Sequence, residues 1–206
     1  MQRCHARVVH FSRRAMVALI VCLPSQAAAQ HAGNAGPTPI VAPKEGTQFD
    51  FLVGQWELTG QPLATTLAQR LHGVGKLPGT WKAWRALDGW GLEDELRLTD
   101  ASGNPVLFTH TVRYYNSTAR RWTLNAIDVY KGIISTPTAE WRGDEMIVSG
   151  SGKEPDGRAY ISRGTYSKIT PTSFTYRLDR SYDNGKKWTE GVTRIDAKRV
   201  AATAPR

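Results

Sequence analysis

Apolar and polar residues alternate along most of the chain after residue 80. Strict alternation is typical of β-strands, because successive side chains of a strand point to opposite faces of the sheet. Good turn formers, such as 100–104 and 183–185, separate these alternating segments. The expected strands are a first one that opens at Trp56, followed by 80–86, 90–98, 105–115, 121–130, 132–141, 144–150, 158–167, 173–182 and 187–196.

This pattern predicts an all-β fold of about ten antiparallel strands joined by hairpins. A meander of that length exposes two sheet edges unless it closes on itself. We therefore expect an up-and-down β-barrel, with a β-sandwich as the alternative. The short segment from Phe49 to Val53, directly before the first strand, reads as a single turn that plugs one end of the barrel.

One segment, 62–72, breaks the β-pattern. Leu63, Leu67 and Leu71 recur every four residues, with Pro62 suited to a first helical turn and Gly73 to a position just past the end. The spacing predicts a short amphipathic helix that lies across a barrel mouth. The two threonines inside the segment suit an extended strand equally well.

The N-terminus resembles an export signal. Four arginines precede an apolar run at 15–23, which is too short to span a bilayer, and Ala27–Ala29 supply a small-residue cleavage site. We expect cleavage near Ala29 and a secreted or periplasmic protein. Ser12-Arg13-Arg14 leaves twin-arginine export open. The expected organisation is a signal peptide at 1–29, a flexible linker at 30–47, a barrel domain at 48–200 and a tail at 201–206.

Composition and charge narrow the function classes. Cys4 and Cys22 both lie in the expected signal, so the mature chain would hold no disulfide and depend on core packing. Loss of the four signal arginines lowers the net charge from +9 to +5, and the remaining Lys and Arg are spread along the strands. A nucleic-acid surface needs a clustered basic patch, so we expect no nucleic-acid partner. We also expect no membrane-spanning segment in the mature chain.

Several motifs together resemble a family of secreted lipocalin-like (calycin) barrels without an assigned function. They are Phe49-Asp50-Phe51…Gly54-x-Trp56, Asp88-Gly89-Trp90-Gly91…Asp94-Glu95, Tyr114…Arg121-Trp122 and Ser181-x-Asp183-x-Gly185-x-x-Trp188, which span roughly residues 48–200. The resemblance implies that Trp56 closes the barrel floor under an arginine of the last strand, Arg194 or Arg199. By analogy it implies the binding of small molecules.

The last of these motifs also matches the Asp-box of β-propellers. A propeller needs several copies at a fixed period, and this chain carries one. The simpler interpretation is structural: Asp183 and Gly185 form a tight hairpin over which Trp188 packs. Haem-binding relatives of the barrel family use a histidine near the C-terminus, and no histidine follows His110 here. We therefore expect no cofactor.

Alternation also predicts which polar side chains enter the barrel. In 90–98, Asp94 shares a face with Trp90 and leucines, and in 105–115, His110 shares a face with valines and aromatics. If the 100–104 turn centres on Ser102, Asp94 lies directly opposite His110, close enough for a hydrogen bond. The expected interior site consists of Trp90, Asp94, His110, Asp128, Tyr176 and Arg180.

Three functions fit this expected site. The first is binding of a small, largely apolar molecule whose polar group meets the cluster. The second is an isomerase or hydrolase in which His110, paired with Asp94, acts as general acid or base. The third is an envelope interaction module with a filled core and no ligand. The spacing of Asp94, His110 and Asp128 does not suggest a metal site, and the sequence leaves the oligomeric state open.

Overall fold

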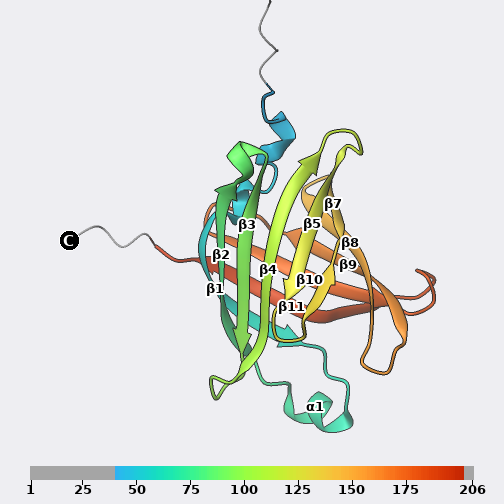
Figure 1. The fold of residues 1–206 in the computed structure, drawn as a ribbon. Helices are drawn as coiled ribbons and strands as arrows, with labels where there is room; N and C mark the ends of the chain where they lie inside the picture. The colour runs from blue at the N-terminus through green and yellow to red at the C-terminus, as the bar shows by residue number, and fades with distance from the viewer. Residues whose placement is uncertain (1–39, 202–206) are drawn as a thin grey trace, which may run out of the picture. The chain divides into compact units, whose positions relative to one another are not determined.

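The fold comes from a computed structural model that describes residues 40–201 (Figure 1). The expected signal peptide, the first ten residues of the expected linker and all but the first residue of the expected tail lie outside the described residues. In the described range, the structure contains no helix of the length and apolar character needed to cross a membrane.

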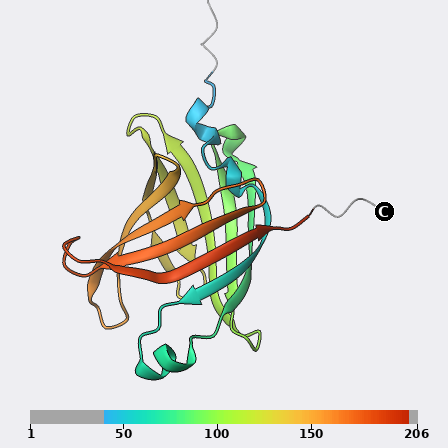
Figure 2. The same ribbon diagram turned by 180° about the vertical axis from the view of Figure 1, so that it is seen from behind.

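Ten antiparallel strands form a closed barrel (Figures 1 and 2). Hydrogen bonding runs in the order β4-β3-β2-β1-β11-β10-β9-β8-β7-β5, and β5 pairs with β4 to complete the ring. This confirms the predicted all-β barrel over the sandwich. The strands are β1 Gly54–Pro62, β2 Leu77–Ala86, β3 Gly91–Thr99, β4 Pro105–Asn116, β5 Arg121–Asp128, β6 Ile133–Ser135, β7 Thr138–Arg142, β8 Glu145–Lys153, β9 Ala159–Ser167, β10 Ser173–Ser181 and β11 Thr189–Arg199.

The expected strand at 132–141 is two strands. β6 pairs with the end of β5, β7 pairs with its start, and Pro137 lies between them. Proline has no N–H to donate to a ladder, so a break at this position is the outcome that its chemistry favours. The carbonyl of Pro137 still accepts a hydrogen bond from the amide of Leu124, 2.9 Å away, which holds the break against β5.

Two 3₁₀ turns, η1 Lys44–Thr47 and η2 Asp50–Leu52, plug one end of the barrel (Figure 1). Phe49 and Leu52 are fully buried there. The ring of Phe49 meets that of Trp122 edge-on at 4.9 Å, a favourable arrangement for aromatic pairs. The expected linker therefore ends in a packed turn: Gly46 of η1 is buried, and Arg85 donates to its carbonyl at 2.8 Å.

Trp56 lies in the floor of this closed end, beneath an arginine of the last strand. The guanidinium carbon of Arg199 lies 4.1 Å from the centre of the Trp56 ring system. Arg199 was one of the two expected candidates; the other, Arg194, points to the outer wall, where it pairs in register with Arg177 and Gln61. The expectation for Arg194 is thus wrong, because β11 places positions 194 and 199 on different faces.

Arg199 also fixes the plug to the barrel. It donates to the carbonyl of Val53 at 2.7 Å, to that of Phe51 at 3.2 Å and to that of Pro171 at 2.6 Å. Gly54 has a positive φ of 129°, and a Cβ at this position would collide with Nη1 of Arg199. Glycine is therefore required here both by backbone conformation and by space.

The helix in the connection between β1 and β2 is shorter than predicted. α1 spans Leu67–His72. Pro62, where the helix was expected to begin, is instead the last residue of β1. Thr66 and Gln69 form a reciprocal capping box at its start, which explains where the helix begins. Leu67 and Leu71 are 72% and 71% exposed, and α1 lies beside the end of the barrel opposite the plug (Figure 1). We call that end the mouth.

Candidate functional site

The hairpin between β3 and β4 does not have the expected register. Asp94 pairs with Thr111, and His110 pairs with Glu95. A register shift between Leu98 and Thr99 moves the partner strand by one residue relative to a turn centred on Ser102. Because side chains alternate, a slip of one residue transfers the whole set of β4 side chains to the opposite face.

His110 consequently lies on the outer wall. Its Nε2 lies 3.6 Å from a carboxylate oxygen of Glu93 and its Nδ1 lies 3.9 Å from one of Glu95. The side chain is 30% exposed. The predicted Asp94–His110 pair inside the barrel is wrong, and with it the arrangement of a general base that the enzyme alternative required.

The residue that meets Asp94 inside the barrel is Arg113. Nε and Nη2 of Arg113 both donate to the Asp94 carboxylate, the latter at 3.2 Å. Nε1 of Trp81 donates to the same carboxylate at 2.8 Å. The side chains of Asp94 and Arg113 are only 1% and 4% exposed. Buried charges are tolerated when they are paired and hydrogen-bonded, and this pair satisfies both conditions for the carboxylate.

The guanidinium of Arg113 is not fully satisfied. Nη1 is buried and has no hydrogen-bond partner among the described residues. The guanidinium carbon lies 4.9 Å from the ring centre of Phe49 and 6.0 Å from that of Tyr166, so aromatic faces surround it. Burial opposes its charge, but the nearby Asp94 carboxylate and Tyr166 keep the pKa of Arg113 above its ordinary value. The site therefore holds a permanent cation whose Nη1 has no hydrogen bond of full geometry, with the Tyr166 hydroxyl close to the guanidinium.

Two tyrosines on neighbouring strands extend the site toward the mouth. The rings of Tyr166 on β9 and Tyr176 on β10 lie 4.8 Å apart, and Trp81 lies within 6.3 Å of both. Burial raises the pKa of Tyr176 to about 12 and raises that of Tyr166 as well. Both phenols therefore stay protonated at neutral pH and can donate a hydrogen bond.

Small and large inward-facing side chains are mixed beyond this layer, with Leu178 and Arg180 following Tyr176 on the same face of β10. Thr111 pairs with Ala126 across β4 and β5, and Gly150 pairs with Ser162 across β8 and β9. Ala126, Gly150 and Ser162 are partly exposed, in contrast to the buried aromatic layer at the plug. The side chain of Tyr160 lies over Gly152 and that of Tyr176 lies over Gly164, so tyrosines occupy the space beside these two glycines.

Large apolar side chains are exposed around the mouth. They belong to the β1–β2 connection, the start of β4 and the β5–β6 hairpin, all of which lie at this end of the antiparallel barrel. Contiguous apolar patches on a protein surface mark binding sites, whereas single exposed apolar side chains are ordinary. The exposed residues are Leu63, Leu67, Leu71, Val106, Val129, Tyr130, Ile133 and Ile134.

The remaining residues of the predicted site do not join Asp94. Asp128 bonds Lys131 in its own turn, with Oδ2 2.6 Å from Nζ. Arg180 lies in a separate cluster, where it donates to Glu154 at 2.7 Å and stacks 4.3 Å from the ring centre of Tyr160. Trp90 follows the 3₁₀ turn η3, Leu87–Gly89, between β2 and β3 and is half-buried at the plug end. Tyr176 alone adjoins the Asp94–Arg113 pair.

The late motif forms the hairpin between β10 and β11. The hydroxyl of Ser181 donates to Asp183 at 2.8 Å and accepts from the amide of Gly185 at 2.8 Å. Trp188 packs against Arg163, whose guanidinium carbon lies 4.5 Å from its ring centre. These contacts agree with the structural interpretation of the motif. Within residues 40–201, no group of three or more His, Cys, Asp or Glu side chains is arranged to hold a metal ion.

Arg113 is the residue of the candidate site that sequence reasoning missed. The alternation in 105–115 places either the odd or the even positions inside, and the even set is the more apolar. A signal was nevertheless present: a buried Asp94 needs a cation nearby, and Arg113 is the only cation in that strand. The need to pair the charge of Asp94 indicates the odd-numbered face of β4 as the inner one, whereas hydrophobicity indicated the even-numbered face.

No protein-family model matches the chain. No curated protein matches it either. A solved structure titled "Structure of EF1p2_mFAP2b bound to DFHBI" aligns with 75% of this chain and 98% of that chain, at 12% identity and a TM-score of 0.37. A likeness this distant carries no argument about binding, and the lipocalin-like resemblance stays a prediction. The chain's own geometry establishes the fold: a closed ten-stranded antiparallel β-barrel.

Proposed function

We propose that the barrel binds a small, largely apolar molecule through its mouth and anchors an oxygen of that molecule on Arg113. The observation that carries this proposal is the unpartnered Nη1 of a buried, ion-paired arginine. Asp94 already balances the charge of Arg113, so the ligand needs an acceptor oxygen rather than a full negative charge. A carbonyl, hydroxyl or carboxyl group meets this requirement.

The free-energy balance favours such an occupant. A buried donor without an acceptor costs about 1–3 kcal/mol, and a ligand oxygen at Nη1 recovers this cost. The phenols of Tyr166 and Tyr176 supply further donors on the same side. The aromatic surfaces of Trp81, Tyr166 and Tyr176 suit an apolar or aromatic ligand body.

The mouth supports the same ligand class. Its exposed apolar residues favour transfer of an apolar molecule from water. This proposal keeps the ligand class expected from the sequence but replaces His110 by Arg113 as the anchor. Arg180 lies in its own ion-paired cluster and has no part in it.

Native mass spectrometry of the purified protein, compared with its denatured mass, tests the proposal. Anilinonaphthalene sulfonate fluorescence provides a second readout with a named apolar probe. The double variant Asp94→Asn/Arg113→Met removes both charges and the Nη1 donor. The amide oxygen of Asn at position 94 can still accept from Nε1 of Trp81, so we expect the barrel to stay folded. We expect this double variant to lose the co-purified mass and at least about tenfold in probe affinity, which corresponds to about 1.4 kcal/mol.

Glu93→Gln is the matched control, since Glu93 neighbours Asp94 but points to the outer wall. It should bind as the unmodified protein does. Equal binding by the folded double variant would refute the role of Arg113. Absence of any bound mass or probe would favour the third function, an interaction module, which the tightly packed aromatic residues of the closed half also suit.

We also propose that the protein acts outside the cytoplasm. The support is the basic, apolar and small-residue order of 1–29. The N-terminal sequence of protein recovered from an exporting host tests this. A mature chain that begins at Gln30 agrees with the proposal, and an intact N-terminus contradicts it.

A further inference from the structure

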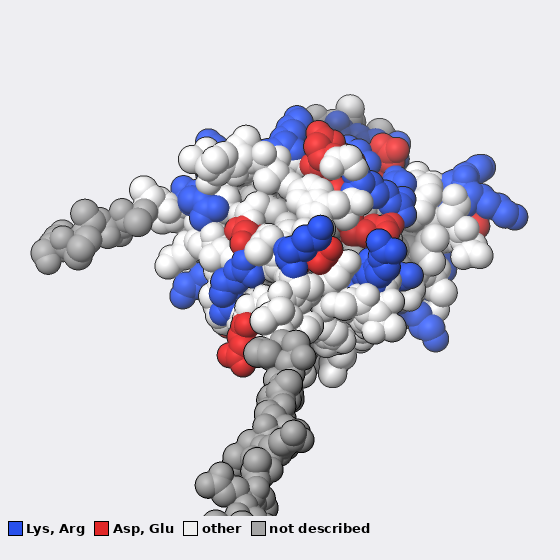
Figure 3. Space-filling view, turned by 90° about the horizontal axis from the view of Figure 1, so that it is seen from above, with Lys and Arg blue, Asp and Glu red and all other residues white. Residues whose placement is uncertain are grey.

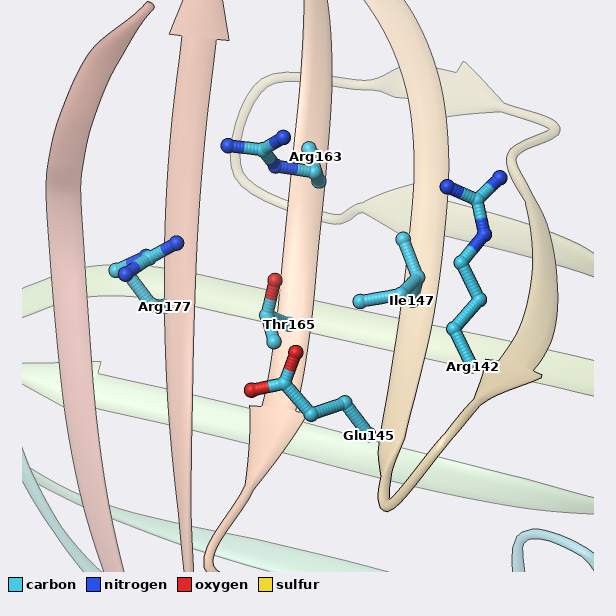
Figure 4. Close-up of a pocket in the computed structure, with 6 residues that line it drawn as sticks. All are labelled: Arg142, Glu145, Ile147, Arg163, Thr165 and Arg177. Carbon is cyan, nitrogen blue, oxygen red and sulfur yellow. The ribbon is translucent and has the colours of Figure 1, made fainter.

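The outer wall formed by β7 to β11 carries two adjoining hollows of about 280 and 330 Å³. They share Glu145, Thr165 and Arg177, so together they form one continuous surface, which we call the outer groove. Figure 4 shows the first hollow, with side chains from β7, β8, β9 and β10 around it. The first hollow lies on the face of the sheet opposite Tyr166, whereas the second also borders Tyr176 and Ile195, whose side chains belong to the interior face.

Cations outnumber acids in the outer groove. Glu145 and Asp196 are its two acidic lining residues. Its five cationic lining residues are Arg142, Arg163, Lys168, Arg177 and Arg194. The face seen from above in Figure 3 is different, because basic and acidic side chains are interspersed there.

A buried carboxylate at the edge of the groove positions two of these arginines. Asp179 is fully buried and accepts from Nη2 of Arg163 at 3.0 Å, while Nε of Arg177 lies 3.0 Å from its other oxygen. The amide of Gly191 donates to it at 2.9 Å. One carboxylate therefore holds two guanidiniums, which leaves an excess positive charge and N–H donors free on both.

Two like charges of the outer groove, those of Arg177 and Arg194, lie directly opposite each other in the sheet. They are direct partners across β10 and β11, on the same face. Like charges directly opposite each other in a sheet are destabilising unless something lies between them. Among the described residues, Arg177 has Asp179 as an ion-pair partner, and Arg194 has none. Arg142 is paired with the exposed Glu140.

We propose that the outer groove binds the oxyanion of a phosphate group, held between Arg177 and Arg194 with Arg163 and Lys168 beside it. Guanidinium forks match the paired oxygens of phosphate, and several convergent arginines are the usual means of recognising it. The hydroxyl of Thr165, at the base of both hollows, adds a donor of the right kind. A soluble phosphate ester and a phospholipid headgroup share this chemistry.

Isothermal titration of the full mature chain with inorganic phosphate, at constant ionic strength against chloride, tests the site. Arg194→Gln is the informative variant, because Arg194 is exposed and its loss should leave the barrel folded. We expect it to weaken phosphate binding about tenfold. Arg121→Gln, which removes an exposed arginine of β5 on another part of the barrel, should leave the affinity within about twofold.

Flotation with phosphatidylglycerol vesicles separates the two sources of phosphate. Vesicle binding that Arg194→Gln removes assigns the groove to a lipid headgroup, whereas phosphate binding without flotation assigns it to a soluble ester. Failure of the unmodified protein to bind either one, or equal loss of binding in Arg121→Gln, overturns the proposal. Asp94→Asn/Arg113→Met should bind phosphate with unchanged affinity. The proposal for the outer groove and the proposal for the barrel interior can therefore be refuted separately.

Discussion

Arg199 covers the indole of Trp56 at 4.1 Å and at the same time donates to the carbonyls of Val53 and Phe51. A single side chain thus closes the barrel floor and ties the N-terminal plug to the last strand. The pairing joins a cation–π contact to charge-assisted hydrogen bonds, and each kind of contact is strong when solvent is largely excluded.

Arg199→Leu should lower the free energy of unfolding by about 3 kcal/mol, because it removes these contacts and leaves buried carbonyls without donors. Chemical denaturation measures the change. Arg194→Leu, on the outer wall of the same strand, is the matched control and should change stability by less than about 0.5 kcal/mol. Equal losses in the two variants would show that Arg199 has no special role.

Asp94→Ala should be far more damaging than joint replacement of the pair. The single change leaves the buried Arg113 charge without its partner, at a cost of about 3–5 kcal/mol. Asp94→Asn/Arg113→Met removes both charges and should cost about 1–2 kcal/mol, since a buried ion pair replaced by neutral groups is often close to neutral. A double-mutant cycle made of Asp94→Asn, Arg113→Met and the combined variant, measured by urea denaturation, gives the coupling. Additive effects would contradict a coupled pair.

Stability should decline at alkaline pH because of Tyr176. Burial raises its pKa from 10.0 to about 12, so the folded protein holds the phenolic proton more tightly than the unfolded chain does. The contribution is complete below pH 10 and is lost as the pH rises toward 12. Thermal unfolding at several pH values should show a smaller decline in Tyr176→Phe, with the exposed Tyr130→Phe as control. An identical decline in Tyr176→Phe would refute this assignment.

Stability should also decline in acid because of Asp179. Burial would raise its pKa, but the amide of Gly191 and the guanidiniums of Arg163 and Arg177 together hold it below the ordinary value of 3.8. The folded state therefore favours the ionised form, and its contribution is present above pH 3.8 and lost as the pH falls below it. Unfolding measured at descending pH should be less acid-sensitive in Asp179→Asn than in Glu140→Gln. The reverse order would contradict the ion-pair geometry.

Alternation and turn chemistry were enough to predict the barrel, because strand period and hairpin residues are local properties of the sequence. They were not enough to predict the register between β3 and β4. The turn itself centres on Ser102, since Thr99 pairs with Pro105, but a bulge between Leu98 and Thr99 places one extra β4 residue in the ladder and exchanges the inner and outer faces of β4. Nothing local in the sequence indicates this bulge.

Sequence reasoning about single side chains succeeded where a chemical requirement was unambiguous. Asp94 was expected inside and is buried, and Trp56 was expected under an arginine and is. Tyr176 was expected inward and packs on Tyr166. His110 was misplaced because imidazole suits both wall and interior, so its position depends entirely on the register.

The pairing of β1 with β11 has a consequence for how the chain folds. Arg199 and Val53 are 146 residues apart in sequence, yet their contact completes the floor. The ring cannot close until the last strand is available, and contacts of such long sequence separation make folding slow. Until synthesis of β11 is complete the ring therefore stays open, with β1 and β10 both waiting for it. Deletion of the final strand should abolish the fold as a whole rather than trim one edge of it.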